Sequence, residues 1–300
     1  MELVDGTVIA THGPLVRVQV GDRTMVMASR RRLDWEGGRP AAARLVVGDR
    51  VAVEMKGGDG VVVAVAKRRN SIVRSSPGAD RPQVVAANID QALLVFAARV
   101  PEARRGLLDR FLVASHLAGV EAVVVINKVD QGTEDVEGWL PVYEGLGYEV
   151  YRVSARTGWG LGRIKRRLAE KTTLFCGPSG AGKSALLNAV YPGFRLKVGS
   201  VSEATGKGRH TTTTAELMPL PYGGFVVDTP GLKEFGLWQA SREQLAGAFP
   251  ELAGRVAGCR FGDCSHLQEP GCAVLEAVAD GSVDRDRYRS YAKILEETCS

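Results

Sequence analysis

Residues 177–184 have the composition and spacing of a loop that binds nucleotide phosphates. They fit the pattern of a glycine, four residues, and then Gly-Lys-Ser or Gly-Lys-Thr. Glycines let backbone amides curl around phosphate oxygens, while Lys183 is placed to reach the β and γ phosphates and Ser184 to hold Mg²⁺. An apolar run before the loop and a helix-like run after it favour this interpretation over an incidental turn. The residues predicted to bind the nucleotide here are Gly177, Pro178, Ser179, Gly180, Ala181, Gly182, Lys183, Ser184 and Ala185.

A second motif, Asn127-Lys128-Val129-Asp130, follows an apolar run and so falls at the carboxyl end of a predicted strand, where nucleotide sites form in α/β sheets. Asp130 selects the base, because a carboxylate accepts hydrogen bonds from both the ring N–H and the amine of guanine. We expect Lys128 to pack on the base and Asn127 to tie neighbouring loops together. Ser154-Ala155, just past another predicted strand, fits a loop that supports the base. These motifs predict a guanine-nucleotide site.

Two further segments complete the predicted site. Asp228 ends an apolar run where a second carboxylate near Mg²⁺ is needed, and Gly231 is placed for an amide to meet the γ phosphate. The loop 206–214 is rich in glycine and threonine, which suits a switch that orders when a threonine ligates Mg²⁺. Base reading thus precedes phosphate binding along the chain, the reverse of the order in common GTPases. The order predicts a circularly permuted domain. A rearrangement driven by hydrolysis should therefore reach the residues after 231.

The residue that orients the attacking water is not the usual glutamine, because Leu232 stands at that position. His210 in the switch loop is the nearest replacement, since a neutral imidazole can orient water or accept its proton. We therefore predict a catalytic role for His210, with a solvated loop histidine as the alternative. Arg209 beside it is a further candidate for offsetting charge in the transition state.

Three cysteines and a histidine lie within fourteen positions near the C-terminus. Three sulfurs and one imidazole suit tetrahedral zinc with no open position, which is the structural kind of site. The intervening residues are loop-like, and the terminal segment is small, so the ion is expected to supply much of its folding free energy. Buried free thiols together with a surface histidine are the alternative. The predicted zinc ligands are Cys259, Cys264, His266 and Cys272.

The net charge of +5 comes entirely from the first quarter of the chain. Residues 1–75 hold 13 Lys and Arg against 8 Asp and Glu, while residues 76–300 hold 26 of each. A basic module favours an anionic partner, nucleic acid first and a membrane surface second, over a merely solvated face. Trp35 is its one aromatic residue, which favours contact with phosphates of folded RNA over base stacking. The expected contributors are Arg30, Arg31, Arg32, Arg44, Arg68 and Arg69.

The 300 residues are too many for one core, and the pattern divides them into three parts. We predict a multidomain α/β protein with an N-terminal OB-fold β-barrel (1–75), a central permuted GTPase sheet (76–240) and a mainly helical zinc domain (241–300). Residues 70–81 are polar, contain Pro77-Gly78 and are predicted to be a linker. The strands expected in the barrel are 4–10, 15–20, 24–28, 50–55 and 61–66, and those in the sheet are 91–97, 122–126, 149–153, 174–176 and 225–227.

Composition also bears on location. The longest apolar stretches fall far short of the ~20 residues that span a bilayer. The N-terminus lacks a basic start followed by an apolar run, so no export signal is expected. Five cysteines are too few for a disulfide scaffold. We expect a cytoplasmic monomer without membrane contact.

Together these residues resemble the ribosome small-subunit-dependent GTPase A family (RsgA, YjeQ or EngC). The resemblance runs from Val47-Gly48-Asp49-Arg50 through Gly208-Arg209-His210-Thr211-Thr212 to the Cys/His cluster and Arg287-Tyr288. It implies a GTPase that acts late in maturation of the small ribosomal subunit and is stimulated by that subunit. It further implies that the GTP state controls binding to and release from the rRNA of the subunit. It also implies His210 as the catalytic residue and Thr212, with Thr211 as the alternative, as the Mg²⁺ ligand beside Ser184.

Two other functions remain open from the sequence. One is a nucleotide sensor that binds a protein partner through the zinc domain and has no RNA role. The other is a small-molecule phosphotransferase, which the switch-like loop and the Asp228-Thr229-Pro230-Gly231 motif disfavour.

Overall fold

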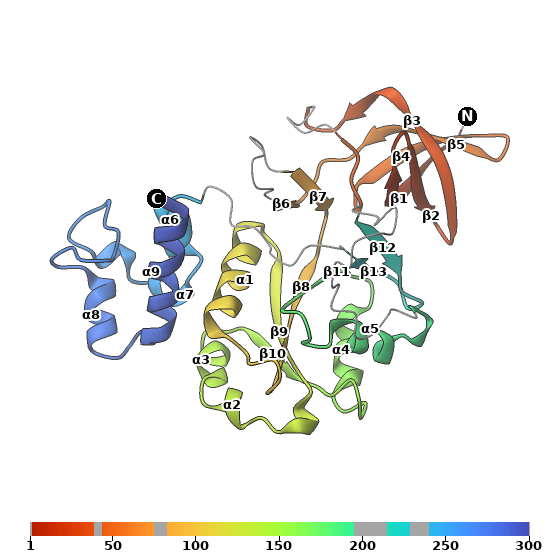
Figure 1. Ribbon diagram of the computed structural model, residues 1–300. Helices are drawn as coiled ribbons and strands as arrows, with labels where there is room; N and C mark the ends of the chain where they lie inside the picture. The colour runs from red at the N-terminus through yellow and green to blue at the C-terminus, as the bar shows by residue number, and fades with distance from the viewer. Residues whose placement is uncertain (1, 39–43, 75–82, 195–214, 229–239, 300) are drawn as a thin grey trace, which may run out of the picture.

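The computed structural model describes residues 2–38, 44–74, 83–194, 215–228 and 240–299. The chain forms a barrel from its N-terminal strands, a central sheet flanked by helices, and a C-terminal group of helices that packs beside the central domain (Figure 1).

The barrel consists of five strands that close on themselves. Their order is β1-β2-β3-β5-β4, and β4 pairs back with β1. This is the five-stranded OB arrangement predicted from the sequence. Its interior is filled by alternating apolar side chains such as Val16 and Val18. The third strand is longer than predicted, because its second half is mostly exposed and polar and so lacks an apolar pattern. The strands are β1 (Glu2–His12), β2 (Leu15–Val20), β3 (Arg23–Trp35), β4 (Arg50–Lys56) and β5 (Asp59–Val65).

The central sheet has the order β10-β9-β8-β11-β13-β12. All neighbours pair in parallel except β12, which is antiparallel to β13 and touches the barrel through one pairing, Ala10 with Glu216. Its inner strands are nearly continuous apolar runs because helices cover both faces. The strands are β8 (Gln91–Ala97), β9 (Glu121–Asn127), β10 (Glu149–Arg152), β11 (Thr172–Cys176), β12 (Glu216–Pro219) and β13 (Phe225–Asp228).

Different helices cover the two faces of this sheet. Phe111 of α1 and Tyr143 of α3 pack against one set of strand side chains, while Ile164 of α4 and Leu186 of α5 pack against the alternate set. Figure 1 shows α1 and α3 on one side of the sheet and α4 and α5 on the other. The helices are α1 (Arg105–Leu117), α2 (Glu134–Glu137), α3 (Leu140–Gly145), α4 (Leu161–Leu168) and α5 (Lys183–Val190).

Part of the predicted linker is a strand. Residues 71–74 pair antiparallel with 83–87 to form a two-stranded sheet, and Ile72 packs into the core of the central domain. The pattern does not show this strand, because it is four residues long and polar residues flank it. The two strands are β6 (Ser71–Arg74) and β7 (Gln83–Ala87).

The C-terminal part is helical, as predicted. Phe249 and Tyr291 form the centre of its core, with their rings edge to face. Val113 of α1 joins the same core, and α9 packs directly on α1. The helices are α6 (Arg242–Gly247), α7 (Pro250–Ala253), α8 (Ala273–Ala279) and α9 (Arg285–Cys299).

A buried ion cluster joins the C-terminal part to the central domain. Arg287 of α9 donates to Asp109 of α1 at 2.6 Å and to Glu251 of α7 at 2.7 Å and 3.1 Å. Tyr143 donates a further hydrogen bond to Asp109 at 2.7 Å, and the guanidinium lies over the rings of Tyr143 and Phe249. Because both carboxylates are nearly inaccessible to water, Arg287 is their main source of neutralising charge.

We expect Arg287→Met to lower the free energy of unfolding by about 3–5 kcal/mol, because it leaves two buried carboxylates uncompensated. Denaturant unfolding of the full chain measures this. The matched control is Arg289→Met on the same helix. The Arg289 side chain is 76% exposed and pairs with Asp286, so its loss should cost no more than about 1 kcal/mol. Equal unfolding midpoints for the two variants would contradict the assigned role of Arg287.

Candidate functional site

The predicted nucleotide motifs meet at the carboxyl ends of β8, β9 and β11. Asn127, the last residue of β9, connects them, because its Nδ2 donates to the carbonyl oxygen of Ala181 at 3.1 Å and its Oδ1 accepts from the amide of Ala155 at 3.0 Å. One buried side chain thus holds the phosphate loop against the loop predicted to support the base.

The phosphate loop needs glycine at two of its positions for steric reasons. A Cβ on Gly177 would lie 2.0 Å from the carbonyl oxygen of Val95 in β8, and one on Gly182 would lie 2.5 Å from Nδ2 of Asn127. Both residues also have positive φ, at 135° and 91°. The Nζ of Lys183 donates to the carbonyl oxygens of Gly177 and Pro178 at 2.7 and 2.9 Å, so the lysine folds back over the loop. Backbone amides, a lysine and the start of α5 converge here, as an anion requires.

Asp130 is held ready to accept hydrogen bonds. The Ser154 hydroxyl donates to its Oδ1 at 2.5 Å and lowers the pKa of the carboxyl group, an effect to which the charge of Arg156 adds. The carboxylate is therefore ionised and acts only as an acceptor near neutral pH. Its Oδ2 is 2.8 Å from the Arg156 guanidinium, yet this buried oxygen has no partner in hydrogen-bond geometry. An acceptor of this kind fits the two N–H groups of guanine.

The other predicted nucleotide residues take different positions. Lys128 donates from Nζ to the carbonyl oxygen of Val100 at 2.7 Å, an acceptor that the sequence did not indicate. Val129 begins a short 3₁₀ turn, and Asp228 ends β13, opposite Glu216 in β12. Ser179 and Gly180 are exposed at the loop tip, Ala181 is buried, and Ser184 and Ala185 lie in the first turn of α5. His210, Thr211, Thr212, Gly231 and Leu232 lie outside the described residues.

The predicted zinc ligands come together at one point. Their ligand atoms all lie within 4.8 Å of one another. Nδ1 of His266 lies 3.4 Å from Sγ of Cys259 and 3.5 Å from Sγ of Cys272, and the two sulfurs are 3.9 Å apart. A tetrahedral zinc with ordinary bond lengths sets these separations at about 3.6 Å for S to N and about 3.8 Å for S to S. The four residues therefore fit zinc in both chemistry and spacing.

A second layer of contacts shapes the loop that carries these ligands. Glu269 accepts hydrogen bonds from the amide and hydroxyl of Ser265 and from the amides of Leu267 and Gln268; the Ser265 hydroxyl contributes most to lowering its pKa. Tyr288 and Tyr291 of α9 donate to the carbonyl oxygens of His266 and Ser265, both at 2.9 Å. These hydrogen bonds fix the backbone of the loop and so orient the metal ligands that it carries. The sequence reasoning did not assign these roles.

The barrel arginines divide into two groups. Arg30, Arg31, Arg32, Arg44 and Arg69 are exposed, although Arg30 forms an ion pair with Glu54 and Arg69 forms one with Asp90. Arg68 instead binds the fully buried Asp49 at 2.7 Å and lies over the ring of Trp35. Arg68 is thus occupied by a structural contact, and the candidates for contact with RNA are Arg31, Arg32 and Arg44, which are exposed and form no ion pair among the described residues.

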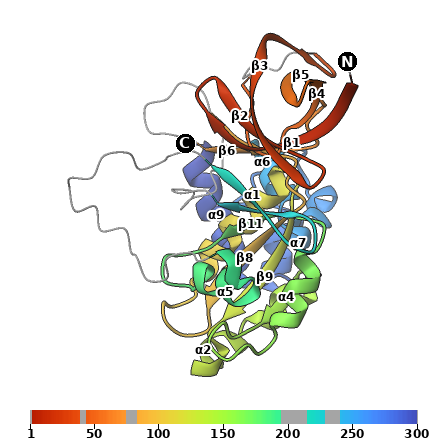
Figure 2. The same ribbon diagram turned by 90° about the vertical axis from the view of Figure 1, so that its right-hand side faces the viewer.

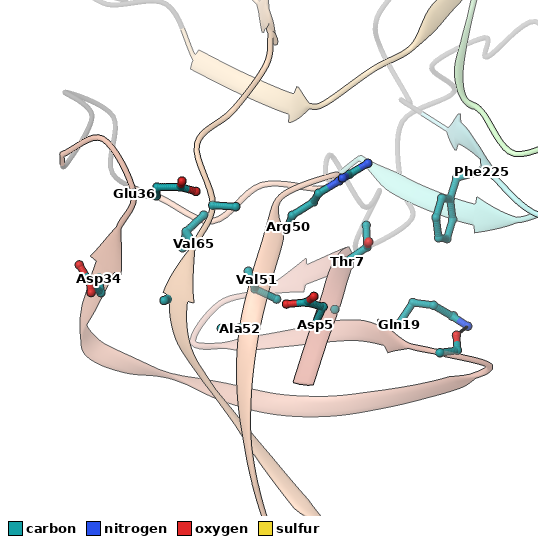
Figure 3. A pocket seen from close by; sticks show the side chains of 14 residues that line it. Asp5, Thr7, Gln19, Asp34, Glu36, Arg50, Val51, Ala52, Val65 and Phe225 are labelled. Carbon is teal, nitrogen blue, oxygen red and sulfur yellow. Dashed lines mark hydrogen bonds between the residues drawn. The ribbon is translucent and has the colours of Figure 1, made fainter. Parts of the chain in front are cut away.

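A cavity of about 750 Å³ lies where the barrel meets β13 (Figure 3). Arg50 and the carboxylates of Asp5, Asp34 and Glu36 are among its lining groups, and Phe225 closes the side of the central sheet. None of the predicted nucleotide residues lines it. Its excess of carboxylates makes it a poor match for phosphate groups.

Comparison with known proteins agrees with this geometry. The family model described as RsgA GTPase matches residues 65–238, more than half of the chain. The chain belongs to the RsgA GTPase family. The "Small ribosomal subunit biogenesis GTPase RsgA" of Gemmatimonas aurantiaca is 43% identical over 261 residues, which is 85% of each chain.

Two solved structures resemble the whole fold of this RsgA-family chain. The crystal structure of YjeQ from Thermotoga maritima superposes with a TM-score of 0.80 at 33% identity and covers 100% of this chain and 99% of its own. YloQ, whose title calls it a circularly permuted GTPase, superposes at 0.76 with 31% identity and covers 99% and 95%. The predicted family, fold class and GTP-hydrolysing activity are therefore confirmed. In the described part of the chain, no helix has the length and apolar character to cross a bilayer.

Proposed function

We propose that this GTPase binds the small ribosomal subunit late in its maturation, that the subunit stimulates GTP hydrolysis, and that the GTP state sets binding to and release from rRNA. The observation that carries the proposal is the pairing of a guanine-reading site with a basic barrel on one chain. Exposed arginines such as Arg31 and Arg32 supply the cationic surface that an rRNA backbone requires.

The test is GTP hydrolysis by the full chain alone, with purified small ribosomal subunits, and with large subunits as the control. We expect stimulation by small subunits only, and less of it as salt rises, because phosphate contacts are lost as counterions compete. Equal, slow rates in all three mixtures would reject the ribosomal role and favour a sensor that awaits another partner.

Magnesium is assigned to Ser184 of the phosphate loop and to Thr212 of the switch loop. The hydroxyl of Ser184 stands in the first turn of α5, directly after Lys183, which is where a phosphate-loop ligand to the ion is needed. Bound with GTP, the ion would neutralise charge on the β and γ phosphates. Lys183 would release the loop carbonyls and donate to the same phosphates.

His210 is assigned the orientation of the attacking water. We expect His210→Ala to bind GTP with unchanged affinity and to hydrolyse it about 10²–10⁴-fold more slowly, because a positioned acid or base contributes that much. Nucleotide affinity and single-turnover hydrolysis with small subunits measure the two effects separately. Wild-type turnover in this variant would remove His210 from the reaction, and lost affinity would make it a binding residue instead.

A further inference from the structure

We infer that the loop 155–160 and helix α4 form a second RNA-binding surface on the central domain, where Trp159 stacks on an unpaired base and Arg163 and Arg166 bind neighbouring phosphates. The inference rests on the proposed function, because it takes rRNA as the partner. Figures 1 and 2 both place α4 well away from the barrel, so this surface is separate from the barrel arginines.

Trp159 is the most exposed aromatic side chain in the described part of the chain, at 59%. Its loop is nevertheless well anchored. The carbonyl oxygen of Trp159 accepts from the amide of Ser154 at 3.0 Å, and its amide donates to Oγ1 of Thr157 at 3.4 Å. Gly160 follows with a φ of 76°, where a Cβ would lie 2.6 Å from the carbonyl oxygen of Arg152. A large apolar ring held in water by a rigid loop is suited to stacking.

Helix α4 is rich in basic side chains, including two arginines that form no ion pair among the described residues. Its eight residues, Leu-Gly-Arg-Ile-Lys-Arg-Arg-Leu, include four basic side chains and no acidic one. The apolar residues face the sheet, which leaves the basic ones toward solvent. Arg167 is held by Glu121 and Glu149, whereas Arg163 and Arg166 are in no ion pair among the residues that the structure describes. With Tyr151, these three arginines line a hollow of about 420 Å³.

The chemistry of this surface fits RNA. A hollow lined by guanidinium groups takes an anion such as a phosphate, which arginine binds through several N–H donors. Trp159, two residues before the start of α4, offers an aromatic ring that accepts any base, because stacking is tolerant of sequence. The barrel does not offer this pair, since its one tryptophan, Trp35, is half-buried with the Arg68 guanidinium over its ring.

The position of the loop links this surface to the nucleotide site. The loop begins after Ser154. The hydroxyl of this serine is hydrogen-bonded to Asp130, and its amide is hydrogen-bonded to the backbone of Trp159. An RNA base stacked on Trp159 would therefore contact the same loop that is predicted to support guanine. Two hydrogen bonds connect Trp159 to Asp130: the amide of Ser154 donates to the carbonyl oxygen of Trp159, and the hydroxyl of Ser154 donates to Asp130.

The test is equilibrium binding of purified small ribosomal subunits to the full chain with a non-hydrolysable GTP analogue, over a series of salt concentrations. Loss of a stacking contact in Trp159→Ala should weaken binding about 5- to 100-fold, and Trp159→Tyr should retain most of the affinity. Arg163→Gln with Arg166→Gln should reduce the salt dependence, by about 0.7–0.9 in slope for each phosphate lost. The control, Arg104→Gln with Arg242→Gln, removes equal charge from two other exposed arginines and should leave the slope unchanged.

Each outcome is informative. Equal GTP affinity and unfolding midpoints show that the variants are folded. Wild-type protein that fails to bind small subunits rejects the proposed function and this inference with it. Wild-type binding that all variants share, with the same salt slope, overturns the inference alone. Ultraviolet crosslinking supports it if residues 154–167 crosslink to rRNA and overturns it if they crosslink to a ribosomal protein.

Discussion

Removal of zinc is expected to unfold the C-terminal domain of this GTPase while leaving the nucleotide site folded. A structural zinc contributes about 10–16 kcal/mol of apparent binding free energy in small zinc-dependent folds. That exceeds most of the ~5–15 kcal/mol by which folded domains are stable. Treatment with a chelator, or Cys272→Ser at the buried ligand, should abolish the helical signal and protease resistance of residues 240–299.

Two controls separate this effect from a general loss of structure. Binding of a fluorescent GDP analogue should persist after chelation, because the phosphate loop and Asn127 contact no residue of the zinc cluster. Cys176→Ala removes a buried thiol of β11 outside the cluster and should retain one zinc per chain. A Cys272→Ser protein that keeps its zinc and its resistance to protease would contradict the predicted ligand set.

Asp130→Asn is expected to weaken GTP binding about 10⁴-fold and to create a preference for xanthosine triphosphate. The variant replaces a carboxylate oxygen by an N–H donor, which opposes the guanine amine but matches the carbonyl that xanthine has in its place. Sites built to hydrogen-bond a group discriminate by about 10⁴–10⁵ against a ligand that cannot pair. Competition binding with GTP and xanthosine triphosphate measures this change in preference.

Arg156→Gln is the matched control for this prediction. Its guanidinium lies 2.8 Å from Oδ2 of Asp130, but its side chain is 76% exposed. We expect this variant to keep its preference for GTP, because the carboxylate that reads the base remains. An Asp130→Asn protein that still prefers GTP would show that another residue reads the base.

Much of the candidate site is predictable because its residues are neighbours in sequence. The phosphate loop is a single run, and the zinc ligands span fourteen positions in one loop system. The pattern also predicts where most strands lie along the chain and in which order the nucleotide motifs follow one another. It could not show that β6 pairs with β7 across residues 75–82, since four polar-flanked residues carry too little signal.

The sequence misleads where a charged residue has a distant partner. Arg68 looks like one more basic residue of the barrel, yet it neutralises the buried carboxylate of Asp49. Arg287 and Asp109 lie 178 positions apart, and nothing local to either indicates a buried ion pair. Charge counted along a chain predicts a surface only for residues that the fold leaves unpaired.

By itself, the sequence predicted the chemistry of the site: a phosphate loop, a carboxylate suited to guanine and four residues that fit zinc. These depend on residue type and short spacing, which the backbone converts directly into local geometry. Only the tertiary structure decided that Asn127 would bind the backbone of Ala181 and Ala155, and that Arg68 would pair with the buried Asp49 while Arg163 and Arg166 form no ion pair among the described residues. The physical reason is that pairing and burial depend on which strands and helices become neighbours in space.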